Sequence, residues 1–277
     1  MDTKVEPKND THNFTKEDWR KVLSQYITLG SDFAKEDIAP REDLISGTEL
    51  DNIMPIFKDS LTVISAPPKN GKSMFMLHLA LNLAWNGNLI LYLSLENSRR
   101  QDRERVDDAC KTYGKEVSDF WNYVNIKDMT KFKTQAVENF IRYFGEFDAI
   151  FIDATEKITQ MGETGSEISK YGREILDKLL NGKFDNENKP AIVCTWQYNK
   201  ENLNNKIEDA SLASLGGSIS AVQMADNIWT ILRDRKTKRW VAKLLTSREV
   251  VTDKDTFDVW DGKAFRLIWE EVLIFVN

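Results

Sequence analysis

The sequence predicts an α/β protein built on a mostly parallel, twisted sheet with helices on both faces. From residue 60 onward, short apolar runs alternate with helix-like segments, which is the pattern of a parallel sheet whose two faces are both covered. Near the end, Asp261-Gly262 lies between two apolar runs and predicts a β-hairpin at the edge of that sheet. With 277 residues, the chain has room for one large domain of this kind plus appendages, or for two small domains.

The N-terminal segment is expected to lie outside the sheet. Residues 1–13 are polar and predict a disordered tail. Thr15 is a suitable N-cap for the helix that follows, in which apolar residues recur at helical spacing from Trp19 to Ile27. This amphipathic helix and its linker, residues 14–45, either pack on their own domain or dock on a partner.

Residues 46–277 are predicted to form the α/β domain itself. Its strand-like runs are residues 61–66, 89–95, 149–153, 191–196, 227–232 and 241–245, and its helix-like segments are residues 73–86, 98–113, 130–144 and 165–181. The run "RRQDRERVDD" mixes both charge signs at helical spacing, which is typical of a solvated helix face. The last residues predict the hairpin and one further edge strand.

The composition limits the class of protein. The net charge of −6 argues against a broadly basic, DNA-coating surface, but it leaves room for a few lysines and arginines focused into a channel. The two cysteines, Cys110 and Cys194, are far apart, so neither a disulfide framework nor a cysteine zinc site is expected and a reducing cytoplasm is the predicted location. No apolar stretch reaches the roughly 18 residues that span a bilayer, so no membrane association is expected.

The stretch "APPKNGKS" has the features of a phosphate-binding loop. It stands between an apolar strand-like run and a helix-like run, so the N–H groups of the turn and of the helix N-terminus would face an anion. The residues expected to bind nucleotide are Ala66, Pro67, Pro68, Lys69, Asn70, Gly71, Lys72 and Ser73. Lys72 would reach the β- and γ-phosphates and Ser73 would bind Mg²⁺. The alternative is an ordinary strand-to-helix turn, and Ala66 stands where the general pattern has glycine.

Two acidic residues follow neighbouring strand-like runs. Glu96, after the second run, is placed to orient an attacking water, although it could also be an N-cap or first-turn acid of the next helix. Asp153 ends the third run, as expected for the carboxylate that holds Mg²⁺ through water. Together with the loop, these acids predict attack of water on the γ-phosphate of ATP, with ATP and Mg²⁺ as the cofactors.

A family resemblance extends this interpretation. The stretch "SAPPKNGKSMFMLHLALNLA…LILYLSLENS" resembles the ATPase domain of DnaB-like replicative helicases, which have the RecA-like fold and often open this loop with alanine. Further segments are similar in the same order: "AIFIDAT", "GSEISKYGREILDKLL", "AIVCTWQYNK" and "LGGSISAVQMADNIWTILRDR". The resemblance covers about residues 45–265, and five motifs in family order are unusual by chance.

The resemblance implies roles for single positions. It makes Lys72 a phosphate ligand, Ser73 and Asp153 the metal-binding residues, and Glu96 the catalytic base. It also makes Gln197 a sensor that reports the γ-phosphate to DNA-facing loops. The catalytic residues implied are Glu96, Lys72, Gln197 and Arg248, and the DNA-binding residues are Lys200, Lys206, Gly216, Gly217 and Ser218. Physically, glycines permit close approach to phosphates and lysines supply charge, but a flexible polar surface loop is an equal alternative for residues 199–218.

The sequence departs from the family pattern in three ways. The helical N-terminal domain used for ring assembly and primase contact is missing, so primase contact is not expected, and the helix in residues 14–45 is the candidate for an inter-subunit hook. Ala154 stands where an aromatic residue is usual. The lysine–x–arginine finger pair reads Thr246-Ser247-Arg248, which keeps the arginine and leaves Lys243 as the nearest lysine. These features fit a compact form of the kind that phages and plasmids encode.

The leading functional hypothesis is an ATP-hydrolysing, ring-forming motor on single-stranded DNA, a DnaB-like helicase or translocase that assembles as a hexamer. One alternative is a RecA-like mediator of recombination or annealing that remodels a nucleoprotein filament. Another is a nucleotide-switched oligomer like the KaiC group, with no DNA. The acidic net charge favours this last hypothesis, whereas the glycine-serine segment and Gln197 favour DNA.

Overall fold

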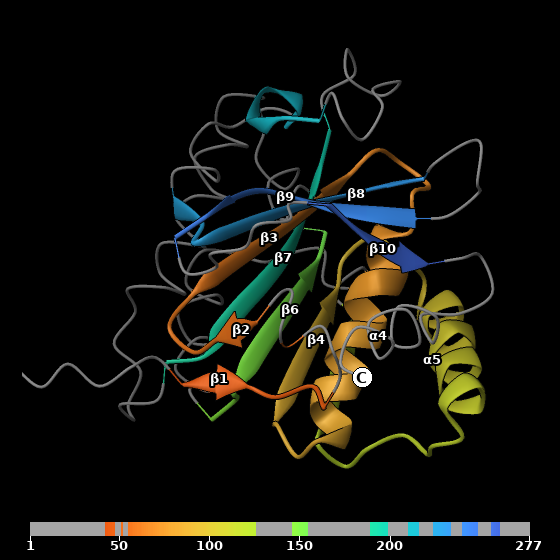
Figure 1. Ribbon diagram of the computed structural model, residues 1–277. Helices are drawn as coiled ribbons and strands as arrows, with labels where there is room; N and C mark the ends of the chain where they lie inside the picture. Colours follow the sequence, from red (N-terminus) through yellow and green to blue (C-terminus); the bar gives the residue numbers. More distant parts are fainter. Residues whose placement is uncertain are drawn as a thin grey trace, which may run out of the picture. The chain divides into compact units, whose positions relative to one another are not determined.

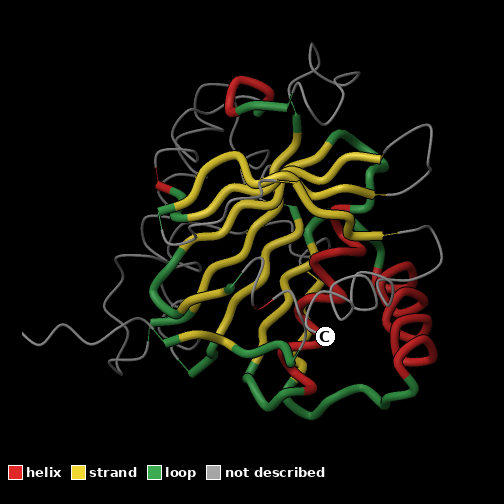
Figure 2. The backbone as a smooth tube through the Cα atoms, in the orientation of Figure 1, coloured by secondary structure: helices red, strands yellow, loops and turns green. Residues whose placement is uncertain are grey.

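The core of the protein is a twisted eight-stranded sheet with the strand order β10-β9-β8-β3-β7-β6-β4-β5 (Figures 1 and 2). The computed structural model describes residues 42–47, 51, 55–125, 146–154, 189–198, 210–215, 224–233, 240–248 and 256–260. The expected tail and amphipathic helix within residues 1–41, the expected helices at 130–144 and 165–181, and the Asp261-Gly262 turn lie outside these residues. All described elements belong to the unit Arg41–Asn277.

Most of the sheet is parallel, as the sequence predicts. Its strands are β3 (Leu61–Ala66), β4 (Ile90–Ser94), β5 (Trp121–Asn125), β6 (Ala149–Asp153), β7 (Ala191–Gln197), β8 (Asn227–Arg233), β9 (Trp240–Ser247) and β10 (Thr256–Trp260). The run from β8 to β5 is parallel throughout, while β9 and β10 are antiparallel and extend the sheet beyond β8. The predicted fold class, an α/β protein built on a mostly parallel, twisted sheet, is therefore confirmed. The predicted C-terminal hairpin lies partly outside the described residues.

Two long helices, α4 (Lys72–Trp85) and α5 (Arg99–Tyr113), pack on the same face of the sheet (Figure 1). Because side chains alternate along a strand, each central strand contributes to two separate cores. In β6, Phe151 packs on the helical face, whereas Ile150 and Ile152 belong to the core on the opposite face. Burial of both faces explains why the central strands read as unbroken apolar runs.

The charged helix α5 is positioned by its ends and by one apolar stripe. Ser98 is the N-cap and forms a capping box with Gln101, and Gly114 ends the helix in the left-handed conformation with φ 61°. The apolar stripe consists of Val106 and Ala109, which are buried in the core between the helices and the sheet. Exposed pairs such as Arg100–Glu104 lie on the outer face, where solvent screens the attraction between the charges. The interpretation of "RRQDRERVDD" as a solvated face therefore fits its exposed residues, whereas Asp102 within the same run is buried.

Sequence patterns did not predict β5 or a small two-stranded sheet. β5 is a half-buried edge strand in which Asn122 and Asn125 interrupt the apolar residues, so it lacks a clean strand signal. The small sheet joins β1 (Asp43–Leu44) to β2 (Ile56–Phe57), in a region that the sequence predicts only as connecting structure. Within the described part of the chain, none of the helices combines the length and apolar character needed to cross a membrane.

Helix α4 buries a histidine beneath α5. The side chain of His78 is 4% exposed, and its Nδ1 lies 3.2 Å from the hydroxyl of Tyr113, with the two rings packed edge to face. Burial disfavours the charged imidazolium and lowers the pKa of His78 from 6.5 to about 4. The folded protein therefore holds this histidine neutral at pH values where the unfolded chain protonates it.

Acidification should destabilise the protein through His78. Between pH 6.5 and about 4 the unfolded chain binds a proton that the folded chain does not, so the free energy of unfolding falls as the pH decreases. At 1.36 kcal/mol per pKa unit, the loss across this window is about 2–3 kcal/mol. His78→Phe should lack this component, so urea unfolding at pH 7 and at pH 4.5 should show a smaller difference for the variant than for the wild type. If the wild type and His78→Phe lost the same free energy of unfolding between pH 7 and pH 4.5, the effect could not be assigned to His78.

Candidate functional site

The predicted nucleotide residues gather at the carboxyl edge of the parallel sheet. β3 ends at Ala66 and β7 at Gln197, and these two residues are paired in register. On the other side, β4 ends at Ser94 and β6 at Asp153, and these are also paired. In open parallel sheets, ligands bind just outside this edge. The fold thus brings the phosphate-binding loop, the turn after β4 that carries Glu96 (the glutamate turn) and Asp153 to the carboxyl edge of the sheet.

The phosphate-binding loop needs glycine at its end and not at its beginning. Ala66 is the last residue of β3 and is fully buried, so it has an ordinary strand conformation. The left-handed positions of the loop are Lys69, with φ 62°, and Gly71, with φ 82°. Gly71 is the N-cap of α4, and its carbonyl accepts the hydrogen bond from the N–H of Phe75 at 2.9 Å. The departure from the general pattern at Ala66 therefore has no structural cost.

Lys72 and Ser73 begin α4, directly after the turn of the loop. The N-cap provides no side-chain hydrogen bond, and the first turn of α4 contains no acidic residue. The N–H groups at this helix end and the positive end of the helix dipole thus favour a bound anion. Lys72 is only 6% exposed, so its charge lies within the site and not in bulk solvent. This geometry is suited to a nucleotide phosphate.

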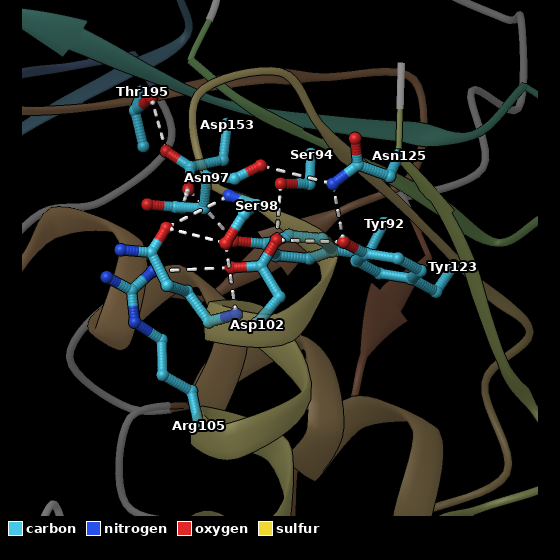
Figure 3. Close-up of polar contacts among 11 residues, drawn as sticks. Tyr92, Ser94, Asn97, Ser98, Asp102, Arg105, Tyr123, Asn125, Asp153 and Thr195 are labelled. Carbon is cyan, nitrogen blue, oxygen red and sulfur yellow. Dashed lines mark hydrogen bonds and ion pairs between the residues drawn. The ribbon is translucent and has the colours of Figure 1, made fainter. Parts of the chain in front are cut away.

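Asp153 is completely buried and is surrounded by hydrogen-bond donors (Figure 3). Its Oδ1 accepts a hydrogen bond from Thr195 Oγ1, and its Oδ2 accepts from Tyr92 and from Asn97 Nδ2, each at 3.2 Å. Burial raises the pKa of the Asp153 carboxyl, while a hydrogen bond from Ser73 and the charge of Lys72 lower it. The carboxylate is therefore linked to the loop by both hydrogen bonding and charge.

Glu96 lies in the turn between β4 and α5. Its side chain is partly exposed. The negative charge of Glu96 contributes to the raised pKa of Asp153, so the two carboxylates are close enough to repel each other. The alternative roles considered for Glu96 are filled by other residues. The N-cap of α5 is Ser98, and the acid in the first turn of the helix is Asp102. Glu96 is thus available to face a ligand at the carboxyl edge.

Gln197 ends β7 beside the loop. The next residue, Tyr198, forms an antiparallel bridge with Leu215. Residues 199–209 follow one partner of this bridge and residues 216–223 follow the other, and both segments lie outside the described residues. They contain all the expected DNA-binding residues: Lys200, Lys206, Gly216, Gly217 and Ser218.

Arg248 lies at the amino ends of the parallel strands, whereas the loop of its own chain lies at their carboxyl ends. It follows β9 next to the start of β8, where its N–H donates to the Asp226 carbonyl at 2.8 Å and its guanidinium lies 3.8 Å from the Asp226 carboxylate. The guanidinium side chain is 60% exposed. Since β3 spans six residues, the two edges are about 20 Å apart. Lys243, the other candidate, donates to the carbonyl of Ala210 at 3.3 Å.

Several partners of the site were missed by sequence reasoning. Thr195 and Tyr92 each lie two residues before a strand end, so strand alternation alone puts them on the same face as that end residue. Next to them, the buried carboxylate of Asp102 accepts hydrogen bonds from Ser94 and from Tyr123 (2.9 Å) and pairs with Arg105 at 3.3 Å (Figure 3). Asp102 belongs to the charge run that predicts a solvated helix face, but this prediction is wrong for this one residue, because it is 1% exposed.

Comparison with known proteins identifies the family. A family model described as an AAA domain matches residues 23–181, more than half of the chain. The chain belongs to the AAA domain family. Membership in this family and the RecA-like core make it a nucleotide-binding P-loop ATPase. No curated protein sequence matches it.

Solved structures resemble this AAA domain protein in fold. The ATPase domain of G40P has a TM-score of 0.51 at 14% identity, over 89% of this chain and 95% of that one. A DnaB-like replicative helicase that interacts with primase has a TM-score of 0.59 at 15% identity, over 89% of this chain and 65% of that one. The flagellar accessory protein FlaH from Methanocaldococcus jannaschii has a TM-score of 0.52 at 16% identity, over 80% and 95%. The resemblance to the ATPase domain of DnaB-like helicases is thus confirmed at the level of the fold.

Glu96→Gln should separate nucleotide binding from hydrolysis. The substitution keeps the shape of the side chain but removes the base, so ATP should still bind while turnover falls by about 10²–10⁴-fold.

Lys72→Ala should abolish hydrolysis in a protein that remains folded, because the charge beside the phosphates is lost. ATP turnover, nucleotide binding and circular dichroism measure these effects. Glu104→Gln, on the exposed face of α5, is the matched control and should hydrolyse ATP normally. Normal turnover in Glu96→Gln would remove Glu96 from the site.

Proposed function

We propose that this protein is an ATP-hydrolysing, ring-forming motor on single-stranded DNA, with the activity of a DnaB-like helicase or translocase. The observation that carries the proposal is the position of the Tyr198–Leu215 bridge directly after Gln197. The chain continues from the two residues of this bridge into the segments that contain the proposed DNA-binding residues. Residues 46–277 would be the motor domain, and residues 14–45 would contact a neighbouring subunit after a disordered tail at 1–13.

The residues at the carboxyl edge fit Mg-ATP. Ser73 supplies a hydroxyl and Asp153 a carboxylate, which are the oxygen ligands that Mg²⁺ prefers. Mg²⁺ usually retains several waters and relies on substrate phosphates, so a full protein cage is not required. Lys72 would neutralise charge on the phosphates, and Glu96 would accept the proton of the attacking water.

A chain of hydrogen bonds offers a physical route from ATP to the DNA-binding segments. The Tyr198 hydroxyl bonds to Thr230, and Thr230 donates to the carbonyl of Ser65 at 3.3 Å. Ser65 immediately precedes Ala66, where the phosphate-binding loop begins. A shift of β3 on nucleotide binding would therefore reach the bridge, and with it Lys200, Lys206 and the Gly216-Gly217-Ser218 backbone.

A hexameric ring would explain the position of Arg248. An exposed arginine about 20 Å from its own loop has no role at that loop, but in a ring it would face the γ-phosphate of the neighbouring subunit. A trans arginine stabilises the charge of the transition state and contributes 10³-fold or more in related phosphoryl-transfer systems. The resemblance to helicase ATPase domains in fold supports the same arrangement. No contact with primase is proposed.

The second candidate function is a nucleotide-switched oligomer that does not bind DNA. Two observations favour it: the fold is also similar to that of the flagellar accessory protein FlaH, with a TM-score of 0.52, and the net charge is −6. A third candidate, a recombination or annealing mediator, shares the ATP and DNA sites and differs only in the absence of directional unwinding.

Single-stranded DNA should stimulate ATP hydrolysis. Because few phosphates are contacted per subunit, DNA binding should weaken with salt along a modest slope. The measurement is the ATPase rate with and without single-stranded DNA over a range of salt concentrations, followed by strand displacement on a forked duplex. Stimulation without displacement would favour the mediator. An ATPase that no nucleic acid affects would contradict the motor and leave the nucleotide-switched oligomer.

Arg248→Ala should bind ATP through its own intact loop but lose turnover. Mixing it with Lys72→Ala, which is inactive for a different reason, creates interfaces with both an intact loop and an intact arginine. Activity should therefore reappear in the mixture, provided that labelled subunits are shown to exchange. An inactive mixture with demonstrated exchange would exclude Arg248 as the trans residue and direct attention to Lys243.

A further inference from the structure

We propose that Asn97 is a positioning residue that fixes the turn carrying Glu96 against Asp153. This inference rests on the proposed ATP hydrolysis and deepens it, because it names a residue that acts through the base and the metal-binding carboxylate. It concerns the turn from Leu95 to Asn97, which together with the N-cap Ser98 connects β4 with α5.

Two hydrogen bonds join this turn to Asp153, one on each side of Glu96. The Leu95 N–H donates to the backbone carbonyl of Asp153 at 2.5 Å. The Asn97 side chain donates from Nδ2 to the carboxylate of the same residue at 3.2 Å. Because the two bonds reach different parts of Asp153, they restrict both the position and the rotation of the turn between them, and Glu96 is the residue between the two donors.

The backbone of Asn97 is held from the other side of the turn. Its carbonyl accepts a hydrogen bond from Asn125 Nδ2 at 3.1 Å, at the end of β5. Asn125 is paired in register with Ser94, the residue that ends β4, so β5 supports the turn from the strand next to it. The amide of Asn125 also lies 3.0 Å from the hydroxyl of Tyr123, which donates to Asp102 (Figure 3). Asn97 is therefore the link between β5 and Asp153.

The side-chain chemistry of asparagine suits this role. An amide N–H donates to an ionised carboxylate without adding charge, whereas an acid here would repel both Glu96 and Asp153. Partners of this kind orient a metal-binding carboxylate, and their removal typically costs 10–100-fold in metal affinity or activity. A merely structural role is the alternative, since Asn97 immediately precedes Ser98, the N-cap of α5.

The test compares Asn97→Ala and Asn97→Asp with the control Asn122→Ala. Asn97→Asp keeps the size of the side chain and removes the donor. Asn122 lies in β5 near the end opposite Asn125, and it donates its side-chain amide to the backbone carbonyl of Ile90 at 3.3 Å, away from Asn97 and Asp153. For each protein we would measure kcat and KM for ATP, thermal stability, and binding of a fluorescent ATP analogue with and without Mg²⁺.

Both Asn97 variants should lose about 10–100-fold in kcat. In Asn97→Ala, the Mg²⁺ concentration that gives half-maximal binding of the analogue should rise by about tenfold. Binding of the analogue without Mg²⁺ should stay within about twofold of the wild type, because it depends on Lys72 and the loop. The control should match the wild type in every measurement.

Wild-type kcat in either Asn97 variant would overturn the proposal, since the donor would then be unnecessary. A loss of kcat with a parallel loss of thermal stability or of Mg²⁺-free binding would also overturn it, by showing a merely structural role. If the wild type itself fails to hydrolyse ATP, the proposed function fails. The Mg²⁺ dependence of analogue binding would then still decide whether Asn97 supports the carboxylate.

Discussion

The buried carboxylate of Asp153 is the group on which the rest of the site depends. A charged group in a protein interior is unfavourable unless donors and opposite charge surround it. Here the donors come from different elements: Ser73 from α4, Tyr92 from β4, Asn97 from the turn and Thr195 from β7. The hydrogen bonds that compensate for burial of the carboxylate therefore also fix the phosphate-binding loop, the glutamate turn and two strands relative to β6.

Much of the fold follows from local sequence, and the exceptions have physical reasons. The central strands are buried on both faces, so their apolar runs are continuous, and α5 has a complete capping box and a terminal glycine. β5 escaped prediction because it is half exposed at the edge of the sheet and contains two asparagines. The order of the strands depends on pairing between distant segments, which a single sequence does not encode in any local pattern.

The residues of the site likewise fall into those that a short motif predicts and those that only the folded structure reveals. The loop residues Lys72 and Ser73 and the strand-end acid Asp153 belong to short motifs, so their type and spacing predict their chemistry. Asn97 and Tyr92 have no such motif, because their importance comes from contact with a residue more than 50 positions away. Arg248 shows a further limit: its distance from its own loop is a property of the sheet, and the identity of the residue alone does not reveal it.

Ala66 has a consequence for the rigidity of the site. A glycine at the end of β3 would be free to sample conformations that alanine cannot, and ordering it would cost about 0.5–1 kcal/mol more. Alanine at this position, paired with Gln197 and fully buried, makes the entrance of the loop an extension of the sheet. The end of the loop that touches the sheet is therefore already ordered before a phosphate binds, and the left-handed positions, Lys69 and Gly71, lie beyond it.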